Sequence, residues 1–256
     1  MSFLDDLKKE AEEKQAKEAQ AANQAEDRER YLREVLDPTM NRLFHFCHDL
    51  SRDLNYVKPD IKVSYTLPGV KGVQEFKQGE YFTEDYHEGH FTFRCICRND
   101  QKYRVLTNNE PDLQKIKDFL WMHGLRYQSR EYFDERYTKC GEFFIEGRVQ
   151  IDFLFTARPD NKSIELKIVN YKEFASFTFS ISPDDVDDTF QDEFARYVVR
   201  QPNKFNDYNR YKFTEEQRRQ LRQQLQGQEV PGAEGQAESA KSSSASLLGG
   251  LFRRKK

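Results

Sequence analysis

The sequence predicts an α+β domain: a mainly antiparallel β-sheet packed with helices, preceded by a long charged N-terminal helix and followed by a disordered C-terminal tail. Of the 35 aromatic residues, 29 lie between Ile61 and Phe213, so this stretch holds the large side chains that a core needs. Apolar residues recur at helical spacing before Pro59 and at alternate positions after it. Beyond Gly227, Gly, Ser, Glu, Gln and Ala dominate, which bury too little apolar surface to fold.

The composition argues against a nucleic-acid-binding protein and against a membrane-spanning one. Charged residues make up 33% of the chain and the mean hydropathy is −0.94, yet the net charge is only −3. Domains that bind duplex nucleic acid usually carry a basic excess, so we expect no nucleic-acid partner. No run approaches the ~20 apolar residues of a membrane span, and residues 1–17 alternate acids and bases, so we expect neither a membrane span nor a signal peptide. Its four cysteines are expected to be free thiols in a reducing cytoplasm.

Residues 1–37 are expected to form a charged helical extension. Ser2 and Asp5 match a capping box, and strong helix formers fill the following turns. After the first two turns the only apolar side chains are alanines, which cannot form a leucine-type heptad seam, so the helix should be solvated. Whether it pairs with another chain stays open. Asp37 and Pro38 then resemble the N-cap and first turn of a second helix, which packs on the domain.

The globular domain is expected over residues 38–213, and its strands follow from alternating apolar and polar residues between turn signals. The alternation of Val149, Ile151, Phe153 and Phe155 with polar neighbours is the clearest, and it indicates an antiparallel sheet with one drier face. The predicted strands are Ile61 to Leu67, Val73 to Lys77, Tyr81 to Tyr86, Phe91 to Arg98, Tyr103 to Leu106, Gly141 to Ile145, Val149 to Thr156, Ser163 to Val169 and Phe174 to Ser180.

Two core helices accompany this sheet. Asn109 and Asp112 form a cap pair for the first, which Gly124 ends. The second is expected to begin at Ser182, with Asp185 completing its capping box, and to end before Pro202. A further helix over residues 214–226 has few apolar residues and should lie on the surface, and residues 227–256 form the disordered tail with a short apolar and basic end.

One group of charged residues points to catalysis. Asp152 lies on one predicted strand, and Glu165 and Lys167 lie on one face of the next. This arrangement resembles the acid and Glu-x-Lys of restriction-type nucleases, a resemblance that implies two carboxylates on Mg²⁺ and a lysine beside the attacked phosphate. The same alternation also generates a solvated face with cross-strand ion pairs. Both interpretations stay open.

Histidines and cysteines raise the question of a metal site. His87, His90, Cys95 and Cys97 are near one another in the sequence, and Cys47 stands beside two further histidines. Cys95 and Cys97, however, alternate in step with two phenylalanines, which places both thiols on the buried face as small apolar groups. We therefore expect no metal and no cofactor.

Two charged segments are candidates for partner binding. An acidic group at a helix N-terminus is favoured there by the helix dipole, but a basic partner would also fit it. An apolar and basic end could dock on a partner or attach peripherally to a membrane, with about 1 kcal/mol contributed by each base. The residues are Asp184, Asp185, Asp187, Asp188, Leu247, Leu248, Leu251, Phe252, Arg253, Arg254, Lys255 and Lys256.

No motif of the nucleotide-binding or serine-hydrolase type is present, and the polar extensions favour a non-catalytic adaptor that binds protein partners. A small-molecule binding module is the alternative, with a pocket lined by strand tyrosines such as Tyr65, Tyr81, Tyr86 and Tyr103. A nuclease that uses Asp152, Glu165 and Lys167 is the third class. An enclosed hollow with converging hydroxyl groups would favour the second class over the first.

Overall fold

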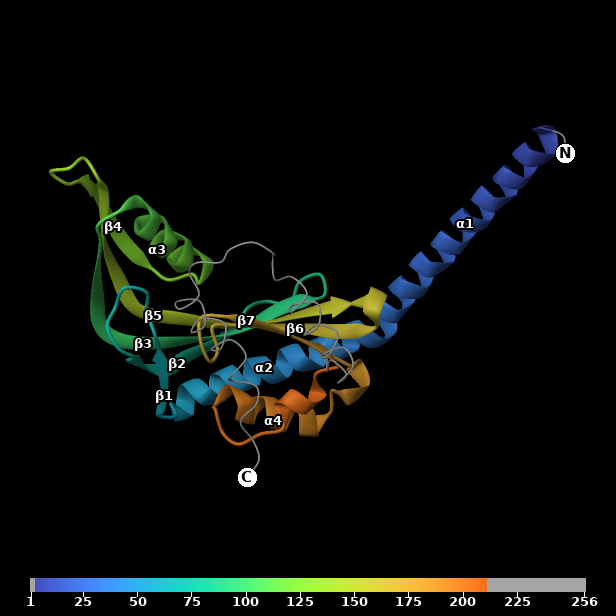
Figure 1. The fold of residues 1–256 in the computed structure, drawn as a ribbon. Helices are drawn as coiled ribbons and strands as arrows, with labels where there is room; N and C mark the ends of the chain where they lie inside the picture. Colours follow the sequence, from blue (N-terminus) through green and yellow to red (C-terminus); the bar gives the residue numbers. More distant parts are fainter. Residues whose placement is uncertain (1–2, 211–256) are drawn as a thin grey trace, which may run out of the picture. The chain divides into compact units, whose positions relative to one another are not determined.

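The computed structural model describes residues 3–210, which begin with one nearly continuous helical rod (Figure 1). Helix α1 (Phe3–Tyr31) leads through a π-helical turn (Leu32–Leu36) into α2 (Asp37–Val57). Every side chain from Lys9 to Arg30 is exposed, which confirms the prediction of a solvated helix. At its base, Arg28 pairs with Asp160 at 2.8 Å.

The expectation that Asp37 caps a separate helix was wrong, because Asp37 is itself helical and its N–H donates to Leu32 five residues back. Proline lacks an N–H and its ring collides with the carbonyl four residues earlier. A π-helical turn widens the helix just before Pro38, so the helix passes the proline without ending. Asp37 instead accepts a hydrogen bond of 2.7 Å from the Tyr86 hydroxyl. Leu36 is fully buried, so the expected extension ends inside the core.

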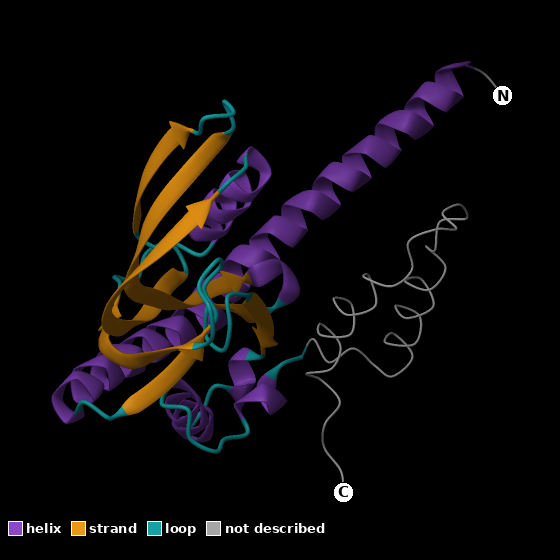
Figure 2. Ribbon diagram, turned by 60° about the vertical axis from the view of Figure 1, so that its left-hand side comes forward, coloured by secondary structure: helices purple, strands orange, loops and turns teal. Residues whose placement is uncertain are grey.

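The sheet is antiparallel and curled, as the sequence predicts (Figure 2). Its order is β1-β2-β3-β5-β6-β7, and β4 pairs with β5 beside this path. The strands are β1 (Ile61–Tyr65), β2 (Gln74–Thr83), β3 (His90–Thr107), β4 (Tyr127–Phe133), β5 (Lys139–Arg158), β6 (Ser163–Val169) and β7 (Ser176–Ile181).

Three pairs of predicted strands are single long strands. The pairing of β2 with β3 shifts register between Gly79 and Phe82, and that of β3 with β5 shifts between Arg98 and Lys102. Such bulges interrupt the alternation, so one strand reads as two in the sequence. Gly147 is required opposite the second shift, because a Cβ there would lie 2.4 Å from the carbonyl oxygen of Asn99.

Helices α2 and α4 (Asp188–Val198) pack against one face of the sheet and enclose an aromatic core (Figure 1). Phe194 of α4 lies at its centre, with ring centroids 6.1 Å from Phe93 and 5.5 Å from both Phe153 and Phe155. These rings are fully buried. We call this part the body: α2, α4, β1, β2, β6, β7 and residues 90–98 and 148–158 of the two long strands. Its outer face is the sheet face opposite α2 and α4.

The two long strands continue beyond the body into a region that we call the arm. It comprises residues 102–107 of β3 and 139–146 of β5, together with α3 (Glu110–Met122), β4 and the turn 134–138. Leu113 and Leu120 of α3 are buried against the same face of the sheet that α2 covers in the body. β4 is not among the strands predicted from the sequence, because its residues after Tyr127 are exposed and show no apolar alternation.

The predicted N-cap of α3 is confirmed, whereas that of α4 was wrong. Asn109 caps α3 as predicted, since its side-chain oxygen accepts from the N–H of Asp112 at 2.8 Å. Ser182 caps only a 3-10 turn, and Asp187 is the N-cap of α4, with a 2.8 Å bond from the N–H of Phe190. The turn uses Pro183 at its first position and delays the α-helix by five residues.

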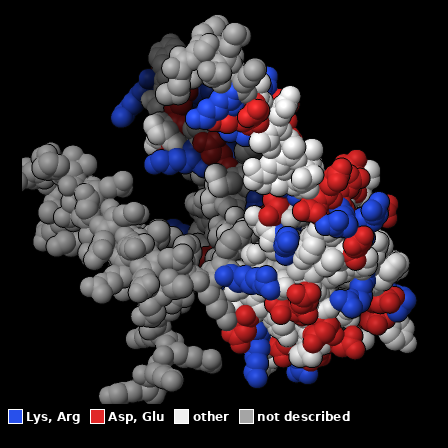
Figure 3. Space-filling model, turned by 90° about the vertical axis from the view of Figure 1, so that its right-hand side faces the viewer, with Lys and Arg blue, Asp and Glu red and all other residues white. Residues whose placement is uncertain are grey.

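The predicted surface helix at 214–226 and the predicted tail at 227–256 lie outside the described residues. Among residues 3–210, no helix combines the length and apolar character that crossing a membrane requires. Basic and acidic side chains lie interspersed on the face drawn in Figure 3, in keeping with the near balance of charge in the sequence.

Candidate functional site

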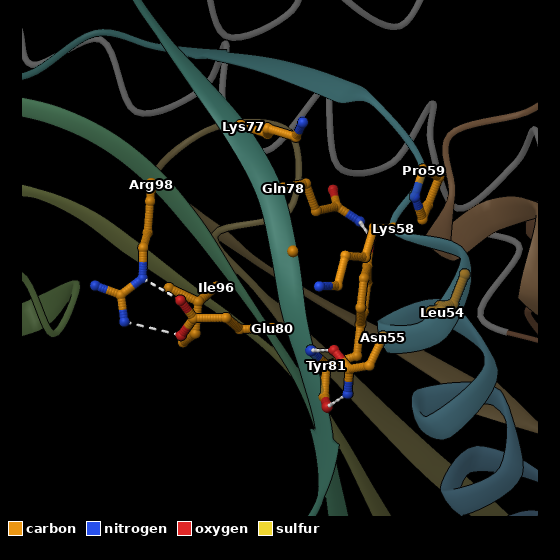
Figure 4. Close-up of a pocket in the computed structure, with 11 residues that line it drawn as sticks. Leu54, Asn55, Lys58, Pro59, Lys77, Gln78, Glu80, Tyr81, Ile96 and Arg98 are labelled. Carbon is orange, nitrogen blue, oxygen red and sulfur yellow. Dashed lines mark hydrogen bonds and ion pairs between the residues drawn. The ribbon is translucent and has the colours of Figure 1, made fainter.

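A hollow of about 310 Å³ lies where the end of α2 meets the bulge of β2 (Figure 4). Asn55 of α2 forms one wall. Its side-chain amide accepts from the N–H of Tyr81 and donates to the carbonyl of Tyr81, as the backbone of a neighbouring strand would. Gly79 opens the hollow, since a Cβ placed on it would meet nothing within 4 Å. The volume is at the small end of ligand pockets, which span about 300–1,000 Å³.

Most charges around this hollow are neutralised within the fold. Arg98 binds both carboxylate oxygens of Glu80, one of them at 2.8 Å, and this bonding lowers the pKa of Glu80. Lys77 pairs with Asp60 at 3.0 Å. Lys58, which ends α2 in the left-handed region at φ 50°, is the one lining cation that has no carboxylate within 4 Å among residues 3–210. The hollow therefore offers a ligand little unsatisfied charge.

A second hollow of about 380 Å³ lies between β1, α3 and the β6–β7 loop, beside Tyr65 and Phe174. The tyrosines proposed for a ligand pocket do not converge on either hollow, because their hydroxyls are used inside the fold. Those of Tyr65 and Tyr86 donate to the Asn170 carbonyl and the Asp37 carboxylate. Those of Tyr81 and Tyr103 accept from amide side chains. The amides are Gln78 and Asn99.

The three residues of the nuclease resemblance share the outer face of the body but do not meet. Asp152 lies opposite Val169, whereas Glu165 lies opposite Thr156. The two acids are thus offset by four residues, roughly 13 Å at the usual rise of a strand. One cation binds oxygens at about 2.0–2.6 Å and cannot contact both carboxylates across that distance. Lys167, opposite Leu154, lies between them.

Both acids are already paired with arginines. Asp152 contacts the Arg94 guanidinium, which also binds Glu84 at 2.6 Å, and Glu165 contacts Arg158 at 2.6 Å. The structure therefore forms the cross-strand ion pairs that the sequence offered as the other interpretation.

The candidate metal ligands also lie apart. Cys95 and Cys97 are buried on the core face, as predicted from their alternation with phenylalanines. Burial raises the pKa of the Cys97 thiol to about 12, so it stays protonated. His87 and His90 are exposed on the β2–β3 turn, with ring centroids 6.0 Å apart. Among residues 3–210, no three histidine, cysteine or acidic side chains form a cluster that could hold a metal.

The acidic segment before α4 is partly engaged in local structure. Asp187 caps the helix, Asp188 lies in its first turn where the dipole favours a carboxylate, and Asp185 lies 3.9 Å from Arg210. The apolar and basic end, 247–256, lies outside the described residues, so its role as a partner site stays a prediction.

The arm carries a surface that the sequence analysis did not single out. Its outer sheet face, which we call the arm face, has no helix over it among residues 3–210, whereas α3 covers the opposite side (Figure 1). Leu106, Tyr132 and Phe144 are 52%, 38% and 39% exposed on it. Charged side chains stand between them, and Arg104 contacts Glu142 across the strands. This face was not predicted because β4, which forms part of it, shows no apolar alternation in the sequence.

Comparison with known protein families, with curated proteins and with solved structures finds no match to this chain.

Proposed function

We propose that this chain is a non-catalytic intracellular adaptor that binds a protein partner through the arm face. The observation that carries the proposal is the distribution of exposed large apolar residues. Seven of the twelve such residues in the described chain belong to the arm, although the body contributes most of the sheet. Leu106, Tyr132 and Phe144 lie on the arm face, and Trp121, Met122, Phe133 and Tyr137 lie elsewhere on the arm.

The chemistry of the arm face supports a protein partner rather than a small ligand. Apolar and aromatic side chains flanked by arginines are typical of the centre of protein interfaces. The arm face is marked by exposed apolar side chains, and neither of the two hollows described above includes any residue of the sheet part of the arm. One edge of β4 pairs with no other strand among residues 3–210, and such an edge can pair with an extended segment of a partner.

Helix α1 is a second element that supports the proposed adaptor function. Its exposed stretch from Lys9 to Arg30 would extend roughly 33 Å at 1.5 Å per residue. A polar helix of this kind contributes little to the cohesion of the body and is available as a spacer or contact for another protein. Four cysteines, all free and buried, support the intracellular setting.

Affinity capture with the full chain tests the proposal, using a Leu106→Thr/Phe144→Thr double variant. Threonine suits a strand, so the variant should keep the fold while it removes apolar contact area from the arm face. The matched control is Phe177→Thr on β7 of the body, because Phe177 is 41% exposed. We expect the wild type and the control to retain the same specific partner and the double variant to lose it.

Equal capture by all three baits would contradict the assignment to the arm face. If no bait retained a specific partner, the adaptor function itself would be abandoned. A further bait without residues 1–30 measures the share of α1, and a loss of capture there alone would move the interface from the arm to α1.

A further inference from the structure

A row of basic side chains crosses the outer face of the body. Strand pairing places Lys62 opposite Lys77, Lys77 opposite Arg98, and Arg98 opposite Arg148, so one cation stands on each of four adjacent strands. Side chains directly opposite each other have Cβ atoms about 4.5–5.5 Å apart, and like charges in such pairs destabilise the sheet. The row therefore requires compensation by anions.

Compensation is complete for three of the four cations. The pairs are Lys62 with Glu75 at 3.0 Å, Lys77 with Asp60 at 3.0 Å, and Arg98 with Glu80 at 2.8 Å. Arg148, at the end of the row, has no carboxylate oxygen within 4 Å in the described part of the chain. Its side chain is half-buried, so water compensates its charge less than it would on an open surface.

Arg126 is a second cation that forms no ion pair with a carboxylate of the described residues. It precedes β4, and its carbonyl accepts the N–H of Glu146 at 3.0 Å, which places it beside the strand that carries Arg148. No carboxylate oxygen of residues 3–210 lies within 4 Å of its guanidinium. Burial, and then the charges of Arg126 and Arg98, lower the pKa of Arg148, an effect that Glu80 opposes. The charge of Arg148 is thus incompletely compensated by the residues that the structure describes.

Beside Arg148, β5 has a strand neighbour on one side only among residues 3–210. On the side of β5 away from β3, pairing with β4 ends at Ile145 and pairing with β6 begins at Asp152. Arg148 lies in this interval, where no strand adjoins β5 among residues 3–210. Arg126 and Asn170 bond this edge at Glu146 and Gln150, so a ligand would approach the guanidinium groups from the outer face.

We propose that Arg148 and Arg126 bind a phosphate group, with Arg98 beside them. The planar fork of a guanidinium group matches the oxygens of phosphate, and two arginines can together compensate a dianion. Two carboxylates also face this place: Glu80, whose oxygens are both bound by Arg98, and Glu146 beside Arg126. The three arginines exceed these acids by one charge, which favours an anion. The site adjoins the arm face but does not use Leu106, Tyr132 or Phe144, so the variants that test the two proposals change different residues.

Thermal unfolding of the full chain with increasing inorganic phosphate, at constant ionic strength set by sodium chloride, tests this site. The variant is Arg148→Met, which keeps the aliphatic stem and removes the charge. The control is Lys167→Met, an exposed cation on the same face. We expect phosphate to raise the Tm of the wild type and the control, and the apparent Kd of Arg148→Met to be weaker by about tenfold or more.

A second readout separates binding from a structural role. In chloride alone, Arg148→Met should have a Tm equal to or above that of the wild type, because it relieves repulsion with Arg98. Identical phosphate responses in all three proteins would overturn the proposal, and so would a Tm of Arg148→Met several degrees lower in chloride. A parallel titration with phenyl phosphate identifies the source of the group: tighter binding assigns the site to a phosphate ester, and weaker binding to free phosphate.

Discussion

β4 and β6 are both seven residues long and pair with the same strand, β5, along the same edge, yet their surroundings are opposite. In β6, Ile164, Leu166 and Ile168 are fully buried. In β4, every residue after Tyr127 is exposed. The difference lies in what surrounds the strands: β6 has β7 on its other side and faces the packed body, whereas β4 has no second strand neighbour in the described part of the chain. Hydrogen bonding to β5 is therefore enough to form a strand, whereas its contribution to stability depends on how much of its side-chain surface is buried by neighbouring elements.

The largest effect expected from this difference is between two phenylalanines of β5. Phe153→Ala in the body should lower the free energy of unfolding by about 3–5 kcal/mol, because the fully buried ring leaves a cavity among aromatic neighbours. Phe144→Ala in the arm should cost less than about 1 kcal/mol, since the ring already contacts water. Urea unfolding of both variants measures the contrast. Equal losses would show that the arm face is packed against something.

The junction between arm and body gives an intermediate effect. The buried side chain of Asn170, just after β6, donates to the carbonyls of His123 and Gln150, both at 3.0 Å, and so ties the end of α3 to β5. Asn170→Ala leaves these carbonyls without their donor and should cost about 1–3 kcal/mol. The control Asn108→Ala changes an exposed asparagine for which no side-chain hydrogen bond is seen among residues 3–210, and it should leave the urea midpoint unchanged.

If Asn170→Ala and its control had the same urea midpoint, the hydrogen bonds of Asn170 would contribute little to stability at the junction. Asn170→Gly sharpens the interpretation, because Asn170 has φ 58° and glycine adopts this conformation without strain. A loss of stability that both Asn170 variants share measures the hydrogen bonds of the side-chain amide. Any stability that the glycine variant has above the alanine variant measures the strain of the left-handed backbone at this position.

The smallest effect is a pH dependence at the same junction. Burial lowers the pKa of His123, although its hydrogen bond to Asn170 opposes the shift. The folded protein therefore binds this proton less readily than the unfolded chain, whose histidine pKa is about 6.5. Stability is complete above that value, falls as the pH decreases through it, and levels off below the folded pKa.

His123→Phe keeps a ring beside Phe119 and Phe174 but removes the titration. Its Tm should change less than that of the wild type between pH 8 and pH 5. Parallel Tm profiles for the two proteins would contradict the assignment of this pH dependence to His123.

Sequence patterns predicted the body far better than the arm. The bounds predicted for β6, Ser163 to Val169, are those of the structure, because a strand buried on one face must alternate. β4 has no buried face after Tyr127, so pattern reasoning had nothing to detect. The capping pair of α3 was equally readable, since Asn109 acts within four residues of its own helix.

The sites depended on information that alternation does not contain. It placed Asp152 and Glu165 on one face correctly, but the register of β5 against β6, which separates them, arises from long-range pairing. The row that ends at Arg148 likewise exists only after four strands have aligned. Individual residue types were visible in the sequence, whereas their neighbours across strands were not.

Hydrogen exchange of the full chain, compared between β4 and β6 at amides that bond β5, tests most directly whether the arm face is open. We expect the β4 amides to exchange at least about tenfold faster, equivalent to about 1.4 kcal/mol less protection. Equal protection of the two strands would contradict the account, because it would mean that the arm face is already covered in the isolated protein and is not available to a partner.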